Sequence, residues 1–539
     1  MRRLGRLAPG ASRSEAAALV AVTLLALVLR LWGSGFGLPY RYHPDENQYV
    51  EDALGFLDGD PNPGRLNNPT LHKTLLAAQY VVMGPLAGWP ADGDDDEGLA
   101  PFYRLGRLNS VFFGAAAVPL LWWLGRLAYG KTVGLLAAAW LAVAFMPVRE
   151  SHFATNDASV TFLVVLGLGL LLGVPAAGSS ARSVAAGVVA GLAVATKYTG
   201  AVLAVPVCVA HLWPEASRRR PDLRRPAVAG LLLALAAMAA AFLLGSPFTV
   251  LDPALFWQDV VKLVNQGRHG YKGQILDPDG GYVFFLKSLR WGMGPPLLAL
   301  ALAGLARAVV RPSRADAVLA SFVLVLYVHQ ARQLMYFARF LLPAVPLLLL
   351  LAARLLEEIV ARAVPGRRGR NVALAGLAVG LALPGAVSAA RFDYLMGRTD
   401  TRTLAARWIQ ANVPPGSSIV TEPYGPPLDR RAFAVQKTDT EGLAWHDQTV
   451  ESYRLAGVTH LVTSSFVFDR RYRDPAQAER LAAFYASLDT QAELLAEFRP
   501  HRTPDRPPFV FTQVYGPVTD LSAFDRPGPL LRVYRIAAP

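Results

Sequence analysis

Long apolar segments separated by short polar ones recur along the first 390 residues. A helix that crosses the hydrocarbon core of a bilayer needs about 20 mostly apolar residues. On that criterion the pattern predicts about eleven membrane-spanning helices, with the break at Thr196–Gly200 separating two short ones. Their expected positions are residues 16–32, 104–124, 132–148, 158–174, 183–196, 199–213, 227–245, 292–310, 315–330, 340–356 and 371–390. Residues 1–390 are therefore expected to form a mostly α-helical, polytopic membrane domain.

The chain changes character after residue 390, because charges become frequent and no stretch is long enough to span a bilayer. Residues Leu404–Asn412 and Pro475–Phe498 have helical spacing. Four segments have the β-branched content and turn boundaries of strands: Ser418–Glu422, His460–Ser464, Phe509–Val514 and Leu530–Ile536. Residues 391–539 are therefore expected to form a small α/β domain.

Composition and charge agree with a membrane protein and indicate its orientation. Hydrophobic residues make up 53% and charged residues 17% of the chain, against about 25% charged in soluble domains. The net charge is +13, and the basic excess lies in short clusters between apolar segments, as at Arg218–Arg220 and Arg367–Arg368. Cytoplasmic loops carry such clusters. We therefore expect a multi-pass protein of the cell (inner or plasma) membrane, with a cytoplasmic N-terminus and an extracytoplasmic domain after Arg391.

Two classes of partner and site are disfavoured by the same composition. Nucleic-acid binding needs a basic face on a folded surface, and the basic residues here are scattered among loops, so no nucleic acid is expected. The single cysteine, Cys208, lies in an apolar segment and excludes an intrachain disulfide or a cysteine metal cluster.

On this topology the polar residues that carry chemistry gather on the outer face. The first outer loop, residues 33–103, is the longest, and its apolar segment 74–89 is expected to lie in the membrane interface as an amphipathic or re-entrant helix. The candidate residues of the outer loops are Asp45, Glu46, Tyr49, His72, Lys73, Asp157, Lys197, His269, Arg332 and Arg339.

The carboxylates allow three interpretations. Asp45 and Glu46, just beyond the first span, would serve as a general base for an acceptor hydroxyl, as oxygen ligands of a divalent cation, or as first-turn acids of a helix after Pro44. Asn156 and Asp157 would likewise make a good N-cap. Both acidic sites lie on one membrane face, so they would also suit a shared reaction cavity.

The cations also have two interpretations. Lys197, Arg332 and Arg339 face outside, against the positive-inside trend, and need an anion that lipid headgroups or a phosphorylated substrate would supply. A lysine at the end of a span usually extends into the headgroups. His72, Lys73 and His269 would join a phosphate site, although a lone histidine is more often structural.

Five motifs in chain order resemble those of polyprenyl-phosphate-dependent glycosyltransferases with the GT-C fold, in particular glycosyltransferase family 39 (the protein O-mannosyltransferase group) and the lipid A aminoarabinose transferases. They are His43-Pro-Asp-Glu-Asn-Gln-Tyr49, Asn68-Pro-Thr-Leu-His-Lys73, Thr155-Asn-Asp157, Ala195-Thr-Lys-Tyr-Thr-Gly200 and Arg339-Phe-Leu-Leu-Pro-Ala-Val-Pro346.

The resemblance implies that a sugar passes, with inversion, from a polyprenyl-phosphate donor to a protein, lipid or glycan acceptor on the outer face. It implies Asp45 as the base, Glu46 as its support and Tyr49 near the donor phosphate. Asp157 would bind the acceptor or tune Asp45. Gln48 stands where the aminoarabinose transferases carry an arginine, so the resemblance does not identify the sugar or the acceptor. No metal or other cofactor is required, and a divalent cation is an alternative.

The rival function is a transporter or flippase for a lipid-linked or anionic substrate. Transporters place ionisable residues near the bilayer midplane and often contain repeats. Here the ionisable residues gather at one face and no repeat is visible. A shared cavity of Asp45 and Asp157, open to the outer face and to lipid, would favour glycosyl transfer.

Overall fold

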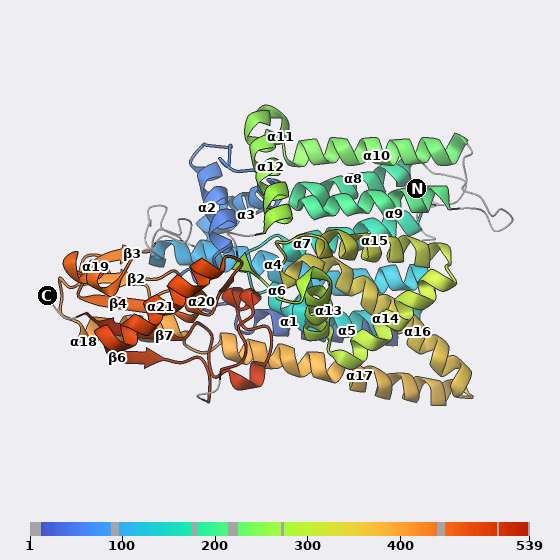
Figure 1. The fold of residues 1–539 in the computed structure, drawn as a ribbon. Helices are drawn as coiled ribbons and strands as arrows, with labels where there is room; N and C mark the ends of the chain where they lie inside the picture. The colour runs from blue at the N-terminus through green and yellow to red at the C-terminus, as the bar shows by residue number, and fades with distance from the viewer. Residues whose placement is uncertain are drawn as a thin grey trace.

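The computed structural model describes residues 12–87, 96–174, 180–213, 225–270, 274–438, 448–503 and 506–536. A bundle of helices forms one end of the molecule and a small sheet with its own helices forms the other (Figure 1). The bundle helices are α1 (Arg13–Leu31), α4 (Asp96–Tyr129), α5 (Lys131–Val143), α6 (Phe145–Glu150), α7 (Asp157–Leu172), α8 (Ser180–Thr196), α9 (Ala204–Leu212), α10 (Arg225–Gly245), α13 (Gly280–Met293), α14 (Pro295–Val310), α15 (Arg314–Ala331), α16 (Val345–Ala363) and α17 (Arg367–Met396).

Every apolar segment expected to span the membrane is helical, although several are interrupted. Among the described residues, five helices are long and apolar enough to cross a membrane, or up to six if the pair α13 and α14, bent by 118°, counts as one span. The expected helix 132–148 breaks at Ala144, and 199–213 begins as the 3₁₀ segment η2 (Tyr198–Leu203). Likewise, the 3₁₀ segment η3 (Ala338–Ala344) precedes α16. The fold is therefore mostly helical, and two of the breaks, at η2 and η3, carry the charged residues Lys197 and Arg339.

Small residues allow close helix packing inside the bundle. The segment Ala338–Ala363, which includes α16, is 78% buried, against 17–44% for the other candidate spans, so it is the central one. On α8, a Cβ at Gly187 or Gly191 would collide with the backbone carbonyls of Ala234 and Met238 on α10. Small residues four positions apart let two backbones approach in this way.

Four short helices lie at the end of the bundle that faces the sheet (Figure 1). They are α2 (Glu46–Leu57), α3 (Leu71–Ala87), α11 (Phe248–Leu251) and α12 (Pro253–His269). Helix α12 begins where the Asp252 carboxylate accepts a hydrogen bond from the Leu255 amide (3.1 Å). Its Asp259 accepts one from the Leu66 amide (2.5 Å) and so holds the segment between α2 and α3. The apolar helix expected at 74–89 is α3, whose last described residue is Ala87.

The C-terminal part contains a five-stranded mixed sheet in the order β3-β2-β4-β7-β6. The strands are β2 (Ser418–Thr421), β3 (Ala434–Lys437), β4 (His460–Ser464), β6 (Glu493–Phe498) and β7 (Leu531–Arg535). Strands β3, β2 and β4 are parallel, and β7 is antiparallel to β4 and β6. One face of the sheet packs on α18 (Thr401–Asn412), and the other packs on α19 (Val450–Leu455) and α21 (Pro475–Gln491). A further pair, β1 (Gln274–Ile275) with β5 (Arg471–Tyr472), joins this part to the bundle.

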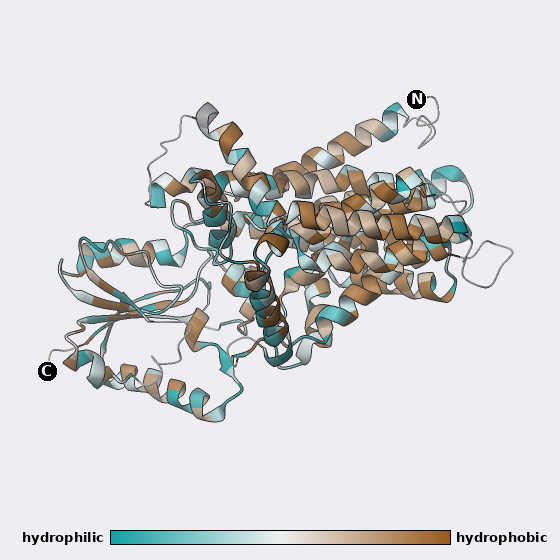
Figure 2. Cartoon of the chain, turned by 90° about the horizontal axis from the view of Figure 1, so that it is seen from above, coloured by the Kyte–Doolittle hydropathy of each residue, from teal (hydrophilic) through white to brown (hydrophobic). Residues whose placement is uncertain are grey.

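Two expectations for the C-terminal part were wrong. Residues Phe509–Val514 are not a strand, because the segment forms the 3₁₀ turn η5 (Phe511–Tyr515) between prolines and Gly516, and its carbonyls turn to the bundle. The helix expected to continue to Phe498 ends at Gln491, and the remainder is β6, because pairing with β7 offers those amides a sheet partner. Hydropathy follows the same division, with brown helices in the bundle and more mixed colouring in the sheet region (Figure 2).

Candidate active site

Four charged residues from distant parts of the sequence meet at the end of the bundle that faces the sheet. They are Asp45 before α2, Asp157 at the start of α7, Lys197 before η2 and Arg339 in η3. Arg339 Nη2 lies 2.6 Å from Asp45 Oδ2, and Arg339 Nε lies 3.8 Å from Asp157 Oδ2. Lys197 Nζ lies 2.6 Å from Asp157 Oδ1. We refer to these four residues as the charge cluster.

The local structure decides against helix capping as the use of either carboxylate. Asp45 occupies the N-cap position of α2, but its side chain makes no capping hydrogen bond. Asn156 occupies the N-cap position of α7 and also makes none, and the Asp157 carboxylate is turned to Lys197 and Arg339. Lys197 likewise does not act as a headgroup anchor, because its side chain is only 14% exposed and is paired with Asp157.

The charges of the cluster interact strongly with one another, because burial removes most of the solvent that would screen them. The Asp157 side chain is 2% exposed and that of Arg339 8%, whereas that of Asp45 keeps 26%. Burial raises the pKa of Asp45, the positive charges of Arg339 and Lys197 oppose this rise, and the negative charge of Asp157 adds to it. A carboxylate with a raised pKa is a stronger base than an ordinary aspartate. Asp45 therefore combines partial exposure to solvent with a raised pKa.

One nitrogen of the cluster has no protein partner. Arg339 Nη1 is buried and makes no hydrogen bond within the described residues, whereas Nη2 is paired with Asp45. A buried donor that stays unsatisfied costs free energy. An anionic oxygen is the natural partner for a guanidinium N–H, so the cluster is suited to hold an anion beside the Asp45 carboxylate.

Glu46 is paired elsewhere, with Arg107 of α4. Its two oxygens accept from Arg107 Nε and Nη2, both at 2.8 Å, and Oε1 also accepts from the Ala154 amide at 2.8 Å. Arg107 in turn donates to the Phe36 carbonyl at 2.7 Å. Glu46 is fully buried. This ion pair fixes the start of α2 against α4 and thereby the position of the neighbouring Asp45.

Tyr49 and His72 lie within electrostatic range of Asp157, and the direct contacts of Tyr49, His72 and Lys73 tie helices together. The Tyr49 ring packs edge-on against His72, with centroids 5.4 Å apart, and His72 Nδ1 is 3.2 Å from Ser159 Oγ. Lys73 Nζ is 2.8 Å from Asp52 Oδ2 and is fully buried. Their recorded hydrogen bonds and ion pairs link α2, α3 and α7 but do not include a member of the charge cluster.

His269 and Arg332 lie on the surface. His269 ends α12, where its Nδ1 is 3.1 Å from the Asn265 carbonyl, and Arg332 follows α15 with an exposed side chain. Within the described residues no recorded contact joins either one to the charge cluster.

The charge cluster does not have the donor set of a cation site. Across the described ranges, no group of three or more His, Cys, Asp or Glu residues is arranged to hold a metal ion. The oxygens of Asp45 and Asp157 are already turned to Arg339 and Lys197. These residues therefore do not fit a divalent cation in this arrangement.

The sequence motifs did not indicate Arg107, Arg149 or Tyr515. Arg107 is signalled only as a charge inside an apolar span, which is costly without a partner. Arg149 donates to the carbonyls of Thr512, Gly516 and Pro517 and so attaches the C-terminal part to the bundle. Tyr515 lies over the Arg339 guanidinium, although nothing in the sequence near Tyr515 resembles a site motif.

A protein-family model described as dolichyl-phosphate-mannose-protein mannosyltransferase matches residues 104–243, a stretch that includes Asp157 and Lys197. No curated protein is similar in sequence at a significant level.

Solved structures are similar over nearly the whole chain. The archaeal oligosaccharyltransferase AglB from Archaeoglobus fulgidus, in complex with an inhibitory peptide and a dolichol-phosphate, has a TM-score of 0.55 at 14% identity, over 93% of this chain and 77% of that one. ArnT from Cupriavidus metallidurans in the apo state has a TM-score of 0.53 at 16% identity, over 90% and 96% of the two chains. ArnT bound to undecaprenyl phosphate has a TM-score of 0.50 at 15% identity, over 97% and 98%. The chain shares the fold of these proteins, which confirms the GT-C fold class that the sequence motifs implied.

Proposed function

We propose that this chain is an integral membrane glycosyltransferase that moves a sugar from a polyprenyl-phosphate carrier to a protein, lipid or glycan acceptor on the outer face of the membrane. The observation that carries the proposal is the charge cluster, in which a partly exposed carboxylate lies beside a buried arginine with an unpaired N–H. The family match and the polyprenyl phosphates named with AglB and ArnT support the donor class.

Asp45 acts as the general base in the proposed reaction. The acceptor oxygen attacks the anomeric carbon from the face opposite the phosphate, and its proton passes to the Asp45 carboxylate. The bond between the anomeric carbon and the phosphate oxygen breaks as the new bond forms, so the configuration inverts. Because Asp45 has a raised pKa, it accepts the proton more readily than an ordinary aspartate would.

Arg339 and Lys197 stabilise the leaving group. Negative charge grows on the phosphate as the bond to the sugar breaks, and prepositioned cations lower the free energy of that transition state. Asp157 holds both cations and raises the pKa of Asp45. Glu46 positions the loop rather than taking a proton, and Tyr49, His72 and Lys73 support the surrounding helices. His269 and Arg332 have no part in this mechanism.

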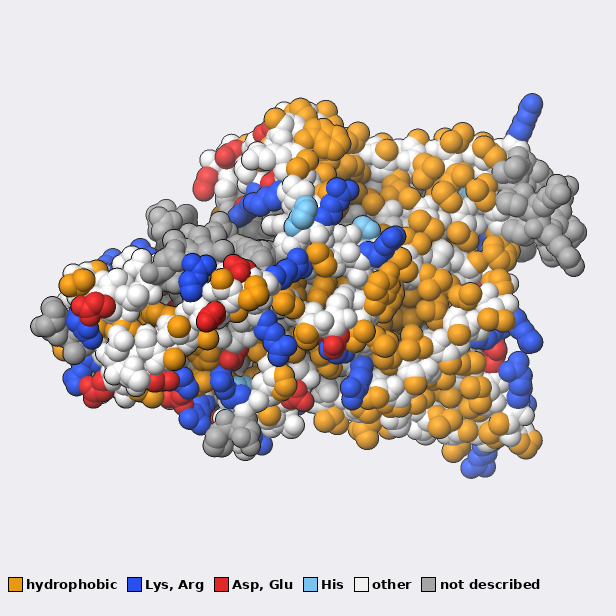
Figure 3. Space-filling model, in the orientation of Figure 1, with side chains coloured by type: hydrophobic (Ala, Val, Ile, Leu, Met, Phe, Trp, Pro, Cys, Tyr) orange, Lys and Arg blue, Asp and Glu red, His pale blue; other side chains and the backbone are white. Residues whose placement is uncertain are grey.

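The proposed topology has about eleven crossings, a cytoplasmic N-terminus and an extracytoplasmic domain formed by residues 391–539. Apolar side chains cover the visible side of the bundle, whereas charged side chains gather over the sheet (Figure 3). The exposed basic residues Arg311, Arg362 and Arg367 lie at ends of α14, α16 and α17, away from the sheet (Figure 1). This distribution supports a cell membrane around the bundle, with the charge cluster on the outer side.

The test is made in a deletion strain, by mass spectrometry of lipid-linked sugars. We expect an unused polyprenyl-phosphate sugar to accumulate in the outer leaflet, where a membrane-impermeant oxidant destroys it. Wild-type protein should remove the accumulation, and Asp45→Asn should not. Asp252→Asn, at a carboxylate that does cap its helix, is the matched control and should behave as wild type. Accumulation confined to the inner leaflet would instead identify a flippase and refute the proposal.

A second test measures binding of undecaprenyl phosphate to the purified protein in nanodiscs. Arg339→Gln and Lys197→Gln should each weaken binding, whereas Arg332→Gln, which changes an exposed cation beyond the cluster, should not. Equal affinities in all three folded variants would show that the cluster does not bind the phosphate.

A further inference from the structure

Tyr515 brings the C-terminal part of the chain into the charge cluster. It is buried, with 8% of its surface exposed, and it ends the 3₁₀ turn η5. The centre of its ring lies 4.2 Å from the guanidinium carbon of Arg339 and 5.2 Å from the centre of the His43 ring. His43 is two residues from Asp45, and its Nδ1 accepts a hydrogen bond from the Asp45 amide at 3.3 Å.

Three aromatic rings surround the Arg339 guanidinium. Besides Tyr515 at 4.2 Å, the ring centres of Phe337 and Phe340 lie 4.7 and 5.8 Å from the guanidinium carbon. All three distances are within the reach of a cation–π attraction, which strengthens when the cation is desolvated. Phe337 and Phe340 belong to the same segment as Arg339, so Tyr515 is the one ring of the three that another part of the chain supplies.

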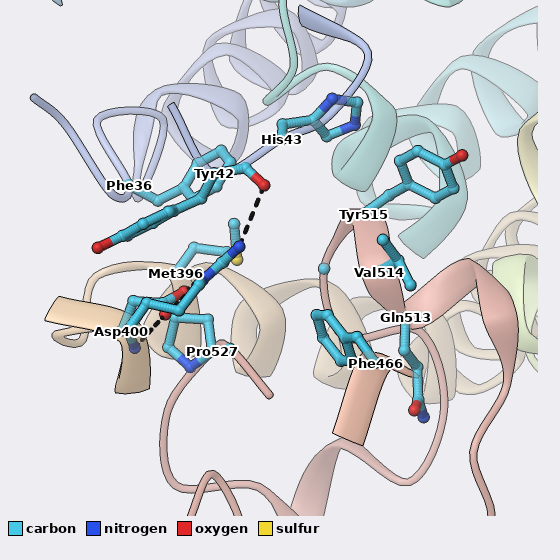
Figure 4. A pocket seen from close by; sticks show the side chains of 13 residues that line it. Phe36, Tyr42, His43, Met396, Asp400, Phe466, Gln513, Val514, Tyr515 and Pro527 are labelled. Carbon is cyan, nitrogen blue, oxygen red and sulfur yellow. Dashed lines mark hydrogen bonds and ion pairs between the residues drawn. The ribbon is translucent and has the colours of Figure 1, made fainter. Parts of the chain in front are cut away.

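The segment that carries Tyr515 is firmly held. Arg149 donates to the Thr512 carbonyl at 3.1 Å and to the Gly516 carbonyl at 3.0 Å, on either side of Tyr515. Tyr515 and His43 lie on the same side of a narrow hollow between the first outer loop and the C-terminal part, with Tyr42 and Phe36 opposite (Figure 4). The ring is therefore fixed by contacts on both sides of the interface.

We infer that Tyr515 is a positioning residue for the donor phosphate, and that the C-terminal part completes the site by holding Arg339 between aromatic rings. The inference rests on the proposed function. Arginine has a long flexible side chain that loses conformational freedom when it binds an anion. The three rings restrict the Arg339 side chain before the phosphate binds, so less conformational freedom is lost on binding. Asp45 pairs with Nη2, and Nη1 stays available for the phosphate.

The experiment compares Tyr515→Leu with Tyr515→Phe in the full-length protein in nanodiscs, with undecaprenyl phosphate as the probe. We expect Tyr515→Leu to weaken binding about tenfold, from the lost cation–π contact and the freed side chain, and to raise the donor KM more than it lowers kcat. Tyr515→Phe keeps the ring and loses only the hydroxyl, which also interacts with Arg339, so it should bind more tightly than Tyr515→Leu. Tyr515→Met fills the space without a π-system and replaces Tyr515→Leu if that variant does not fold.

Phe524→Leu is the matched control. Phe524 is 4% exposed and packs in the same interface between the C-terminal part and the bundle, but no recorded contact joins it to Arg339. It should lower the melting temperature and leave donor affinity unchanged. Wild-type affinity in folded Tyr515→Leu, or an equal loss in Phe524→Leu, would overturn the inference. If Arg339→Gln also kept wild-type affinity, the proposed phosphate site itself would be wrong.

Discussion

The Asp45 carboxylate lies at the N-terminus of a helix and faces an arginine 294 residues further along the chain. Since it caps nothing, the amide in Asp45→Asn removes only the charge and the proton acceptor. We predict a loss of turnover of about 10²–10⁴-fold, the usual contribution of a general base, in a protein that still folds and inserts. Transfer assays at matched protein levels measure the effect.

The neighbouring variant Glu46→Gln tests whether the role of Glu46 is structural or catalytic. Glu46 forms a fully buried pair with Arg107, and breaking a buried ion pair costs about 3–5 kcal/mol because one charge is left uncompensated. We predict that Glu46→Gln lowers stability and folded yield, while the molecules that fold keep most of their turnover per mole. Full activity in Asp45→Asn, or a purely catalytic defect in Glu46→Gln, would reverse the roles that we assign to the two carboxylates.

The pH profile gives a second prediction at the residue scale. The pKa of Asp45 is raised, so transfer should fall on the acid side at a higher pH than an ordinary aspartate would give. Asp157→Asn removes a negative charge that raises this pKa, so it should move the acid limb to lower pH. Lys197→Gln removes a positive charge that lowers the pKa, so it should move the limb to higher pH. Normalised rates against pH test both signs, and shifts in the same direction would exclude Asp45 as the titrating group.

At the scale of elements, the contact between α8 and α10 depends on glycine. A Cβ at Gly191 would overlap the Met238 carbonyl, which belongs to a helix backbone and has little room to move. We predict that Gly191→Ala destabilises the protein by about 1–3 kcal/mol, the typical cost of overpacking. Gly380→Ala on α17 is the control, because its Cβ would meet nothing within 4 Å. Thermal unfolding in detergent should separate the two, and equal melting temperatures would show that α8 and α10 can move apart freely.

At the scale of the whole molecule, the proposed orientation in the membrane rests on the basic loops and can be tested directly. Cysteines introduced at Pro365 and Arg430, both exposed, should label on opposite sides with a membrane-impermeant maleimide in a Cys208→Ser background. We expect Arg430→Cys to label in intact cells and Pro365→Cys only after permeabilisation. Labelling of both in intact cells would contradict the proposed crossing of the membrane by α17.

The sequence alone determined the helices and the chemistry that the site offers. Apolar segments form helices in a membrane because unpaired backbone groups are costly in lipid, so their positions follow from composition. Polar motifs such as Thr155-Asn-Asp157 stand out because charges are rare inside apolar surroundings. Asp157, Lys197 and Arg339 stand out in the sequence for the same reason, and Asp45 stands out as one of a pair of carboxylates just beyond the first span.

Only the tertiary structure decided which of these charges meet. Pairing of Asp45 with Arg339, and of Lys73 with Asp52, depends on how helices pack, which side-chain periodicity does not encode. The tertiary structure also gives the two neighbouring carboxylates different partners, because Glu46 pairs with Arg107 and Asp45 does not. Strand β6 and the turn that carries Tyr515 were missed because short segments take their conformation from the partners they contact rather than from their own propensity.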